Sequence, residues 1–435
     1  MLSDAALRLT AERVLRANWR EGRRRDGTPY AFTCPSPRRY KHQWSWDSCF
    51  HAIAWRHFDP ARAREELRTL VRAGRPDGFI PHTVFWHAAP RWRRAPFYAT
   101  TGWRAEEATA TIQTPLLAVA WELVAAASPD APEFAAEGLP ALRAHADWLE
   151  RERDPDGDGL IAILLPDESG LDDSPKYDHV YGTLAHWRPG YFRLVERCRR
   201  RGWDSRAILA ATDEHVEDVL VNVAHALCNR ALARLEAAAG DPRAATGHAR
   251  RAARTASALA ERCWDERSGL FLDLAGRRER PVPVSTWSAL APLALGDAVP
   301  ERMRRRLVEE HLLDPARYRA PCGIPSVAMC ETAFRPGRDR WRTWRGPAWM
   351  NTAWLLLPGL DALGHGAEAD RIQASLTAAV DRGGFREHYN PLTGAGLGAR
   401  DFGWSTLLVD LPAQRAAARC GAPFAAPGPG VAAQA

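Results

Sequence analysis

Long apolar segments are missing from this chain of 435 residues. No stretch reaches the roughly 18 consecutive apolar residues that indicate a membrane-spanning helix. The first residues, MLSDAALRLTAERVL, contain Asp4 and Glu12 and lack the basic start and apolar centre of a signal peptide. We therefore expect a cytoplasmic protein that has no membrane partner.

Metal-ligand and disulfide patterns are lacking as well. The eight cysteines, from Cys34 to Cys420, contain no CxxC pair, and the 14 histidines show neither HxH nor HxxxH spacing. This argues against a zinc cluster and a disulfide framework, so we predict no metal and no other cofactor. The acidic loop 154–159 (DPDGDG) begins like a calcium loop, but its twelfth position is Leu165, where such loops carry a glutamate. The sequence leaves open whether this loop binds calcium.

Lysine is nearly absent. Lys41 and Lys176 are the only lysines among 59 basic residues, which face 53 acidic ones. The short arginine runs at 23–25 and 304–306 have acidic neighbours, which indicates a solvated surface. We expect no nucleic-acid partner, and nothing in the sequence indicates an oligomeric state.

Alternating β-branched runs are scarce, which argues against a fold built on sheets. Apolar residues recur instead with helical spacing, and Asp59-Pro60 and Asp241-Pro242 provide helix-start signals. The predicted helices cover residues 3–19, 46–57, 60–73, 107–127, 137–152, 212–239, 243–265, 299–312, 347–361, 365–381 and 402–415. This succession predicts an all-α fold, an (α/α)6 barrel with long active-site loops at one end. Without a low-complexity linker, residues 1–420 should form a single domain, followed by a loosely ordered tail, 421–435.

Tryptophan is abundant, with 18 residues against 13 Phe and 8 Tyr. Many of these tryptophans stand beside polar residues. Four segments combine aromatic, carboxyl and glycine residues: YKHQWSWD (40–47), ESGLDDSP (168–175), WRTWRGPAWMNTAW (341–354), and FREHYNPLTG (385–394) followed by GARDFGW (398–404). Helix caps and turns could explain parts of each segment, such as Asp47, Asp172-Asp173 and Pro347.

Carbohydrate chemistry gives these residue types a common purpose. The C–H face of a pyranose stacks on Trp, and its hydroxyls bind to Asp, Gln, Asn and Arg side chains, such as those of Asp47 and Arg345. Glycosidic cleavage needs two further carboxyls, one protonated and one ionised. Asp172 and Glu387 lie in separate loops that a barrel could bring to opposite sides of a sugar.

The segments QWSWDS, DGFIPH, SGLDDSP, WRGPAWMNTAWLL and EHYNPLTGAGLGARDFGWS, in this order, resemble glycoside hydrolase family 63. More narrowly, the chain resembles the bacterial mannosylglycerate and glucosylglycerate hydrolases over about residues 35–415. The resemblance implies an (α/α)6 barrel and inversion at the anomeric carbon, with Asp172 as general acid and Glu387 as general base. An inverting pair should have its carboxyls about 6.5–9.5 Å apart. The implied sugar-binding positions are Tyr40, Trp44, Trp46, Asp47, Gln113, Gly170, Trp344 and Trp349.

Two departures from the family pattern fall near the expected leaving-group side. Asp167 stands where relatives often have Trp, and Thr343 stands where the glycerate hydrolases have Tyr. A negative Asp167 would repel a glycerate carboxylate unless a cation intervenes. Candidate contacts in the loops 74–106 and 176–206 are Arg91, Arg93, Arg94, Tyr98, Tyr181 and Arg188. The predicted substrate is glucosylglycerate or mannosylglycerate, and a neutral α-glucoside or α-mannoside is the alternative.

Two other classes of protein stay open on the sequence. A non-catalytic sugar-binding protein on the same barrel would gain nothing from keeping both Asp172 and Glu387. A helical terpene cyclase would need a DDxxD or DxDD motif, which Asp172-Asp173-Ser-Pro-Lys176 does not supply. Glu217 and Asp218 fall inside the predicted helix 212–239, where a buried structural pair is a simpler interpretation than a catalytic one.

Overall fold

Helices dominate the computed structural model, which describes residues 3–24, 26–86, 108–154, 156–182, 189–337, 343–421 and 424–425. The prediction of a mostly helical protein is confirmed. The candidates Arg91, Arg93, Arg94, Tyr98 and Arg188, and most of the predicted tail, lie outside the described residues.

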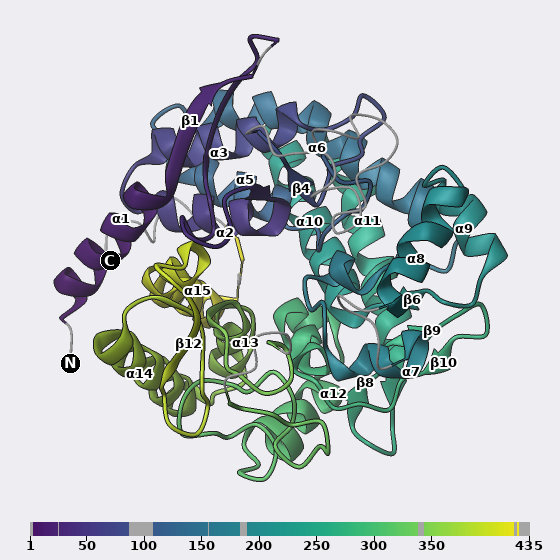
Figure 1. Ribbon diagram of the computed structural model, residues 1–435, viewed down its shortest axis with the longest axis vertical. Helices are drawn as coiled ribbons and strands as arrows, with labels where there is room; N and C mark the ends of the chain where they lie inside the picture. Colours follow the sequence, from purple (N-terminus) through teal and green to yellow (C-terminus); the bar gives the residue numbers. More distant parts are fainter. Residues whose placement is uncertain are drawn as a thin grey trace.

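In the described chain, six helical segments form a closed ring in which each contacts the next and the last contacts the first. They are α2 (Ser45–Trp55), α5 (Leu117–Ala126), α10 (Val219–Ala238), the 3₁₀ segment η4 (Trp287–Ala298), α13 (Met350–Ala362) and η6 (Gly403–Val409), which leads into α15 (Leu411–Arg419). The chain passes once around this ring, from purple through teal and green to yellow (Figure 1). Almost every residue of α2, α5 and α13 is buried, which suits helices that have neighbours on all sides.

A second set of helices packs against the outside of this ring. It comprises α1 (Asp4–Asn18), α3 (Pro60–Arg72), α6 (Ala131–Arg153), α11 (Pro242–Ala258) with η3 (Leu259–Cys263), α12 (Glu301–Arg306) with η5 (Leu307–Leu312), and α14 (Gly366–Gly383). These helices are amphipathic: α3 buries Leu67 and Leu70, whereas Arg64 and Arg68 pair with acidic groups of the neighbouring segment. The predicted starts of two of them are confirmed, because Asp59 and Asp241 accept hydrogen bonds from backbone N–H groups one turn later.

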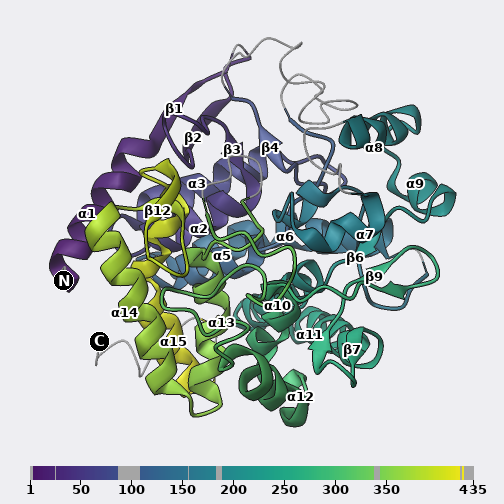
Figure 2. The same ribbon diagram turned by 60° about the horizontal axis from the view of Figure 1, so that its bottom comes forward.

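Short antiparallel strands connect the helices. The pairs are β1 (Trp19–Arg23) with β2 (Pro29–Thr33), β3 (Gln43–Trp44) with β4 (Thr83–Val84), β7 (Trp264–Asp265) with β8 (Leu270–Phe271), and β11 (Arg386–Tyr389) with β12 (Gly396–Arg400). A four-stranded sheet has the order β10 (Arg280–Pro281), β9 (Leu274–Ala275), β6 (Val216–Glu217), β5 (Ala162–Ile163). Strands β1–β4 lie toward the top of Figure 2, and α12 and β7 toward the bottom. The remaining short helices are η1 (Pro166–Ser169), η2 (Pro175–Tyr177), α7 (Asp178–Tyr181), α8 (Pro189–Arg200) and α9 (Ser205–Ala211).

Three predicted helix starts were wrong, and one helical segment was missed. The helix predicted from residue 107 begins only at Leu117, and the helix predicted from residue 137 already begins at Ala131. The helix predicted from residue 212 begins only at Val219, because Asp218 caps it: the Asp218 carboxylate accepts from the backbone N–H of Val221, at 3.1 Å. Glu217 therefore lies in strand β6 and not in a helix. The segment η4 was not predicted, because Pro292 and the non-helical backbone of Gly296 break the periodic pattern.

Within the described ranges, no helix combines the length and apolarity needed to cross a bilayer. All eight cysteines are unpaired, and only Cys330 and Cys420 are exposed. The other six thiols are buried, as the sequence predicted for most of them.

Candidate active site

A cavity of about 300 Å³ opens among the segments that precede the inner helices α2, α5, α13 and η6. All of the predicted site residues except Arg345 line it. The lining consists of Pro35, Arg39, Tyr40, Trp44, Trp46, Asp47, His82, Thr109, Thr111, Gln113, Asp167, Gly170, Asp172, Tyr191, Thr343, Trp344, Trp349, Glu387, Phe402 and Trp404. Four carboxyl groups and several indole rings therefore share one small space.

Glu387 lies on strand β11, and its carboxylate is buried. Oε1 accepts a hydrogen bond from the Tyr40 hydroxyl at 2.9 Å, and Oε2 accepts one from the backbone N–H of Ala399 at 2.7 Å. The Arg39 guanidinium lies 3.4 Å from Oε2. These donors hold the carboxylate in one orientation and compensate its negative charge.

The neighbouring strand β12 approaches Glu387 closely at Gly398. A Cβ atom on Gly398 would lie 2.4 Å from Oε2 and 2.6 Å from Cβ of Glu387, and the backbone φ of Gly398 is +66°. Only glycine meets both requirements without a shift, which explains this residue in the motif. The hairpin is irregular between Arg386 and His388, where the register shifts.

Asp172 lies in the turn that follows η1 and also lines the cavity. Gly170, just before it, has φ +73°, and a Cβ there would lie 2.4 Å from the Trp46 ring. The next residue, Asp173, accepts a hydrogen bond from the backbone N–H of Trp344 at 3.0 Å, which joins this turn to the segment before α13. The turn is thus fixed on both sides of Asp172.

A buried ion pair that the sequence analysis did not identify supports the same turn. Arg153, at the end of α6, donates to both oxygens of Glu168, at 2.7 and 2.8 Å. Glu168 also accepts from the backbone N–H groups of Ile112 and Leu164, at 3.0 and 2.6 Å. No spacing rule could connect Arg153 with Glu168, because each alone reads as a helix-end or turn residue.

The electrostatic environment of Asp172 favours its protonated form. Burial raises the pKa of Asp172 well above its usual range, and the carboxyls of Asp167 and Asp173 raise it further. Burial also raises the pKa of Asp47 to about 7, although His51 opposes the shift. Asp172 and Glu387 thus differ in surroundings: one lies among other acids, and the other is surrounded by donors.

Asp167 shares the cavity wall with Asp172. The Tyr191 hydroxyl donates to its Oδ2 at 2.6 Å. Burial nevertheless raises the pKa of Asp167 to about 7, because the hydrogen bond from Tyr191 only partly offsets it. The departure noted in the sequence therefore places a weakly acidic carboxyl next to Asp172.

Aromatic rings form much of the remaining wall. Trp344 and Trp349 stack with their centroids 3.9 Å apart and their planes 7° apart. Trp404 packs edge-on against Trp46 at 5.1 Å. Gln113 fixes the start of α2, because its Oε1 accepts from the backbone N–H of Trp46 at 3.0 Å. Flat apolar faces beside fixed polar groups are what a pyranose requires.

One predicted site residue was misplaced. Arg345 does not line the cavity, because both of its terminal nitrogens donate to the carboxylate of Asp178, at 2.7 Å each. Asp178 begins α7 and is distant in sequence, so the motif gave no sign of this pair. Tyr181 is likewise buried outside the lining residues.

Ten of the twenty lining residues were not among the predicted site residues, and Arg39, Trp404 and Tyr191 belong to these ten. Arg39 directly precedes the segment 40–47, and Trp404 ends the segment 398–404. Both could therefore have been identified from the recognised segments and the residues beside them. Tyr191 belongs to helix α8, which no motif marked. It reaches the cavity only because the fold brings α8 beside the turn at 166–174.

The chain is similar over most of its length to proteins of stated activity. Residues 40–405 match the mannosylglycerate hydrolase MGH1-like glycoside hydrolase domain. A mannosylglycerate hydrolase from Thermus thermophilus is 32% identical over 411 residues, which are 87% of this chain and 96% of that protein. A glucosylglycerate hydrolase from Mycolicibacterium hassiacum is 27% identical, over 87% of this chain and 93% of that one.

A solved structure agrees with these similarities. The crystal structure of a family 63 mannosylglycerate hydrolase from Thermus thermophilus, in complex with Tris and D-glycerate, has a TM-score of 0.80 at 31% identity. The match covers 94% of this chain and 100% of that chain. The family predicted from the five sequence segments is confirmed, and an enzyme is favoured over a non-catalytic sugar-binding protein. The chain belongs to the mannosylglycerate hydrolase MGH1-like glycoside hydrolases and is an enzyme that hydrolyses O-glycosyl bonds of small glycosides.

Proposed function

We propose that this enzyme hydrolyses mannosylglycerate or glucosylglycerate with inversion, with Asp172 as general acid and Glu387 as general base. The observation that carries the proposal is the contrast between two carboxyls that line one cavity. Asp172 has a raised pKa and can keep a proton for the leaving oxygen. Glu387 accepts from Tyr40 and Ala399 and suits the base that activates a water.

In this mechanism the glycosyl ring lies against the tryptophan wall between the two carboxyls. Asp172 protonates the glycosidic oxygen as the bond to the anomeric carbon breaks. Glu387 removes a proton from a water that attacks the opposite face, so an α-glycoside releases a β-sugar. The separation expected for this pair is about 6.5–9.5 Å. We also propose that the ring of paired helices is an (α/α)6 barrel and that residues 1–420 form one domain.

The relatives' substrates favour a glycerate aglycone. Asp167 favours the second candidate, a neutral glycoside, because an ionised carboxyl there would repel glycerate. The Tyr191 hydroxyl and the raised pKa of Asp167 reduce that repulsion, so we prefer the glycerate compounds.

The test compares kcat/KM for mannosylglycerate, glucosylglycerate and the uncharged glucosylglycerol. A site that pairs the carboxylate should favour the charged compounds strongly, since its donors are otherwise left unpaired. Equal values for charged and uncharged compounds would refute the glycerate assignment but not the hydrolase. NMR of the first sugar released should show the β-anomer, and an initial α-anomer would refute inversion.

A further inference from the structure

Four carboxyl side chains meet at a second place, away from the sugar cavity. One oxygen each of Asp156, Asp158, Glu217 and Glu279 lies within 4.8 Å of the others. None of these residues lines the sugar cavity. They come from the loop after α6, from strand β6, and from the turn between β9 and β10, so the four-stranded sheet brings them together.

The buried carboxyl group of Glu217 indicates that a positive charge is missing at this place. Its residue is only 6% exposed, and its Oε2 has no hydrogen-bond partner among the described residues. A buried carboxylate without a partner is costly, and three further carboxyls around it increase the cost. Consistent with this, burial and the neighbouring acids raise the pKa of Glu217 to about 9.

Arg262 compensates only part of this charge. Its Nε lies 2.9 Å from Asp158 Oδ2, and its Nη2 donates to Glu279 Oε1. In the described part of the chain, no other basic side chain pairs with the four carboxyls, which leaves Asp156 and Glu217 without one. Four carboxyl groups against one guanidinium leave an excess of negative charge, which a divalent cation would compensate.

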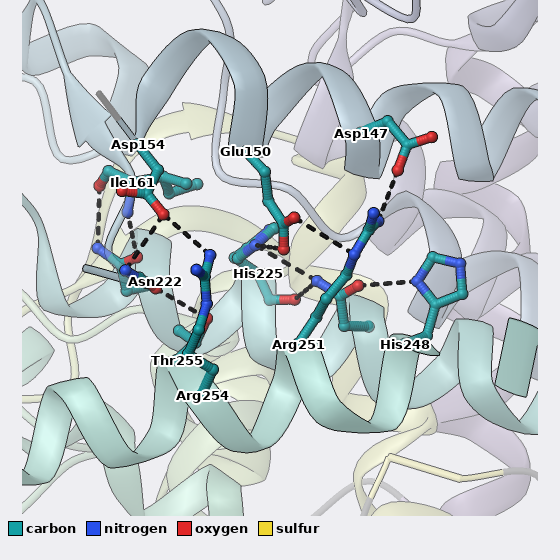
Figure 3. A network of polar contacts seen from close by, with 12 residues as sticks. Asp147, Glu150, Asp154, Ile161, Asn222, His225, His248, Arg251, Arg254 and Thr255 are labelled. Carbon is teal, nitrogen blue, oxygen red and sulfur yellow. Dashed lines mark hydrogen bonds and ion pairs between the residues drawn. The ribbon is translucent and has the colours of Figure 1, made fainter. Parts of the chain in front are cut away.

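The loop that carries Asp156 and Asp158 is held in place at both ends (Figure 3). Asp154 accepts from Arg254 at 3.0 Å and from the backbone N–H of Gly159 at 3.1 Å. The Thr255 hydroxyl donates to the Gly159 carbonyl at 2.9 Å. Asn222 exchanges two hydrogen bonds with the backbone of Ile161, at 2.7 and 3.0 Å. The carboxyl oxygens of Asp156 and Asp158 therefore belong to a loop that these hydrogen bonds fix between α6, α10 and α11.

We propose that Asp156, Asp158, Glu217 and Glu279 bind one calcium ion. An all-oxygen set of carboxylates in an irregular arrangement suits Ca²⁺, which accepts 6–8 oxygens, better than Mg²⁺, which demands near-octahedral geometry. The loop resembles an incomplete calcium loop, whose twelfth position is Leu165. Glu217 and Glu279, distant in sequence, supply the carboxylates that this position lacks.

The ion stabilises the wall behind the general acid. Asp218, next to Glu217, accepts hydrogen bonds from Lys176 Nζ and the Tyr177 hydroxyl, at 2.6 Å each. Lys176 and Tyr177 directly follow the turn that carries Asp172. Binding therefore joins the loop 154–159, the sheet and the acid-bearing segment, and its effect is on stability and not on the chemical step.

The test is calorimetric titration of the full-length enzyme with CaCl₂ after removal of metals with EDTA, together with the Tm. We expect one site with a dissociation constant of about 10⁻⁶–10⁻⁴ M, tighter for Ca²⁺ than for Mg²⁺. Saturating Ca²⁺ should raise Tm by about 2–5 °C. Glu217→Gln, which keeps the shape of the side chain, should weaken binding at least about tenfold.

Asp156→Asn is a second variant, at an exposed carboxyl, in case Glu217→Gln does not fold. Asp147→Asn is the matched control, because Asp147 belongs to helix α6, which leads into the loop, and pairs with Arg251 outside the cluster. It should bind Ca²⁺ like the wild type. Absence of binding below about 10 mM, equal affinity for Mg²⁺, or unchanged binding in both cluster variants would overturn the proposal.

Discussion

Replacing Gly398 by alanine tests how strongly the hairpin β11–β12 controls Glu387. The new Cβ would lie 2.4 Å from Oε2 and 2.6 Å from Cβ of Glu387, so the carboxylate must move. The left-handed backbone of Gly398, with φ +66°, adds a strain of about 1–2 kcal/mol for any other residue. A misplacement of about 1 Å at a reacting group costs roughly 10²-fold in rate. We expect kcat to fall by at least about 10², with Tm lower by only a few degrees.

Gly394→Ala provides the matched control on the same hairpin. Gly394 also has a left-handed backbone, with φ +70°, but a Cβ there would meet the flexible end of Arg382 and not Glu387. Both variants should lose stability, measured as Tm, because both carry backbone strain, and Gly398→Ala should lose more because its Cβ also overlaps Glu387. Only Gly398→Ala should lose activity on mannosylglycerate or glucosylglycerate. Near-normal kcat in Gly398→Ala, or an equal loss in Gly394→Ala, would refute the close-approach argument.

Three further perturbations follow from the same structure. Asp172→Asn and Glu387→Gln should each lower kcat by about 10²–10⁴ while circular dichroism and Tm stay unchanged, and a variant with normal turnover would remove that residue from its role. Asp167→Asn removes a negative neighbour that raises the pKa of Asp172, so the alkaline limb of the kcat/KM profile should move to lower pH; an unmoved limb would contradict this coupling. Asp410 is fully buried, and its pairing with Arg56 and His57 outweighs burial and lowers its pKa, so Asp410→Asn should cost about 3–5 kcal/mol at neutral pH. Because the folded pKa is depressed, this contribution is present above the unfolded value of about 3.9 and is lost as the pH falls through the folded value. The Tm difference between wild type and Asp410→Asn should therefore shrink in acid, and a constant difference would contradict the assignment.

Local sequence carried most of the information about the helices. Asp59-Pro60 and Asp241-Pro242 start helices because a carboxylate cap and a proline in the first turn act within one turn of chain. The segment η4 escaped prediction because Pro292 and Gly296 make it locally a poor helix. Its place in the ring between α10 and α13 stabilises it, and packing of that kind has no local signature.

The sequence by itself also indicated ten of the twenty residues that line the cavity, since the residue types of the aromatic and carboxyl segments suit the binding and cleavage of a sugar. Their partners were decided by the tertiary structure. Whether an arginine is available to a sugar depends on acids elsewhere in the chain, and Asp178 binds Arg345. Likewise, Arg153 supports Glu168, and Glu217 completes an acidic cluster with Asp158, only where folding brings separate segments within the few ångströms over which hydrogen bonds and buried charges act.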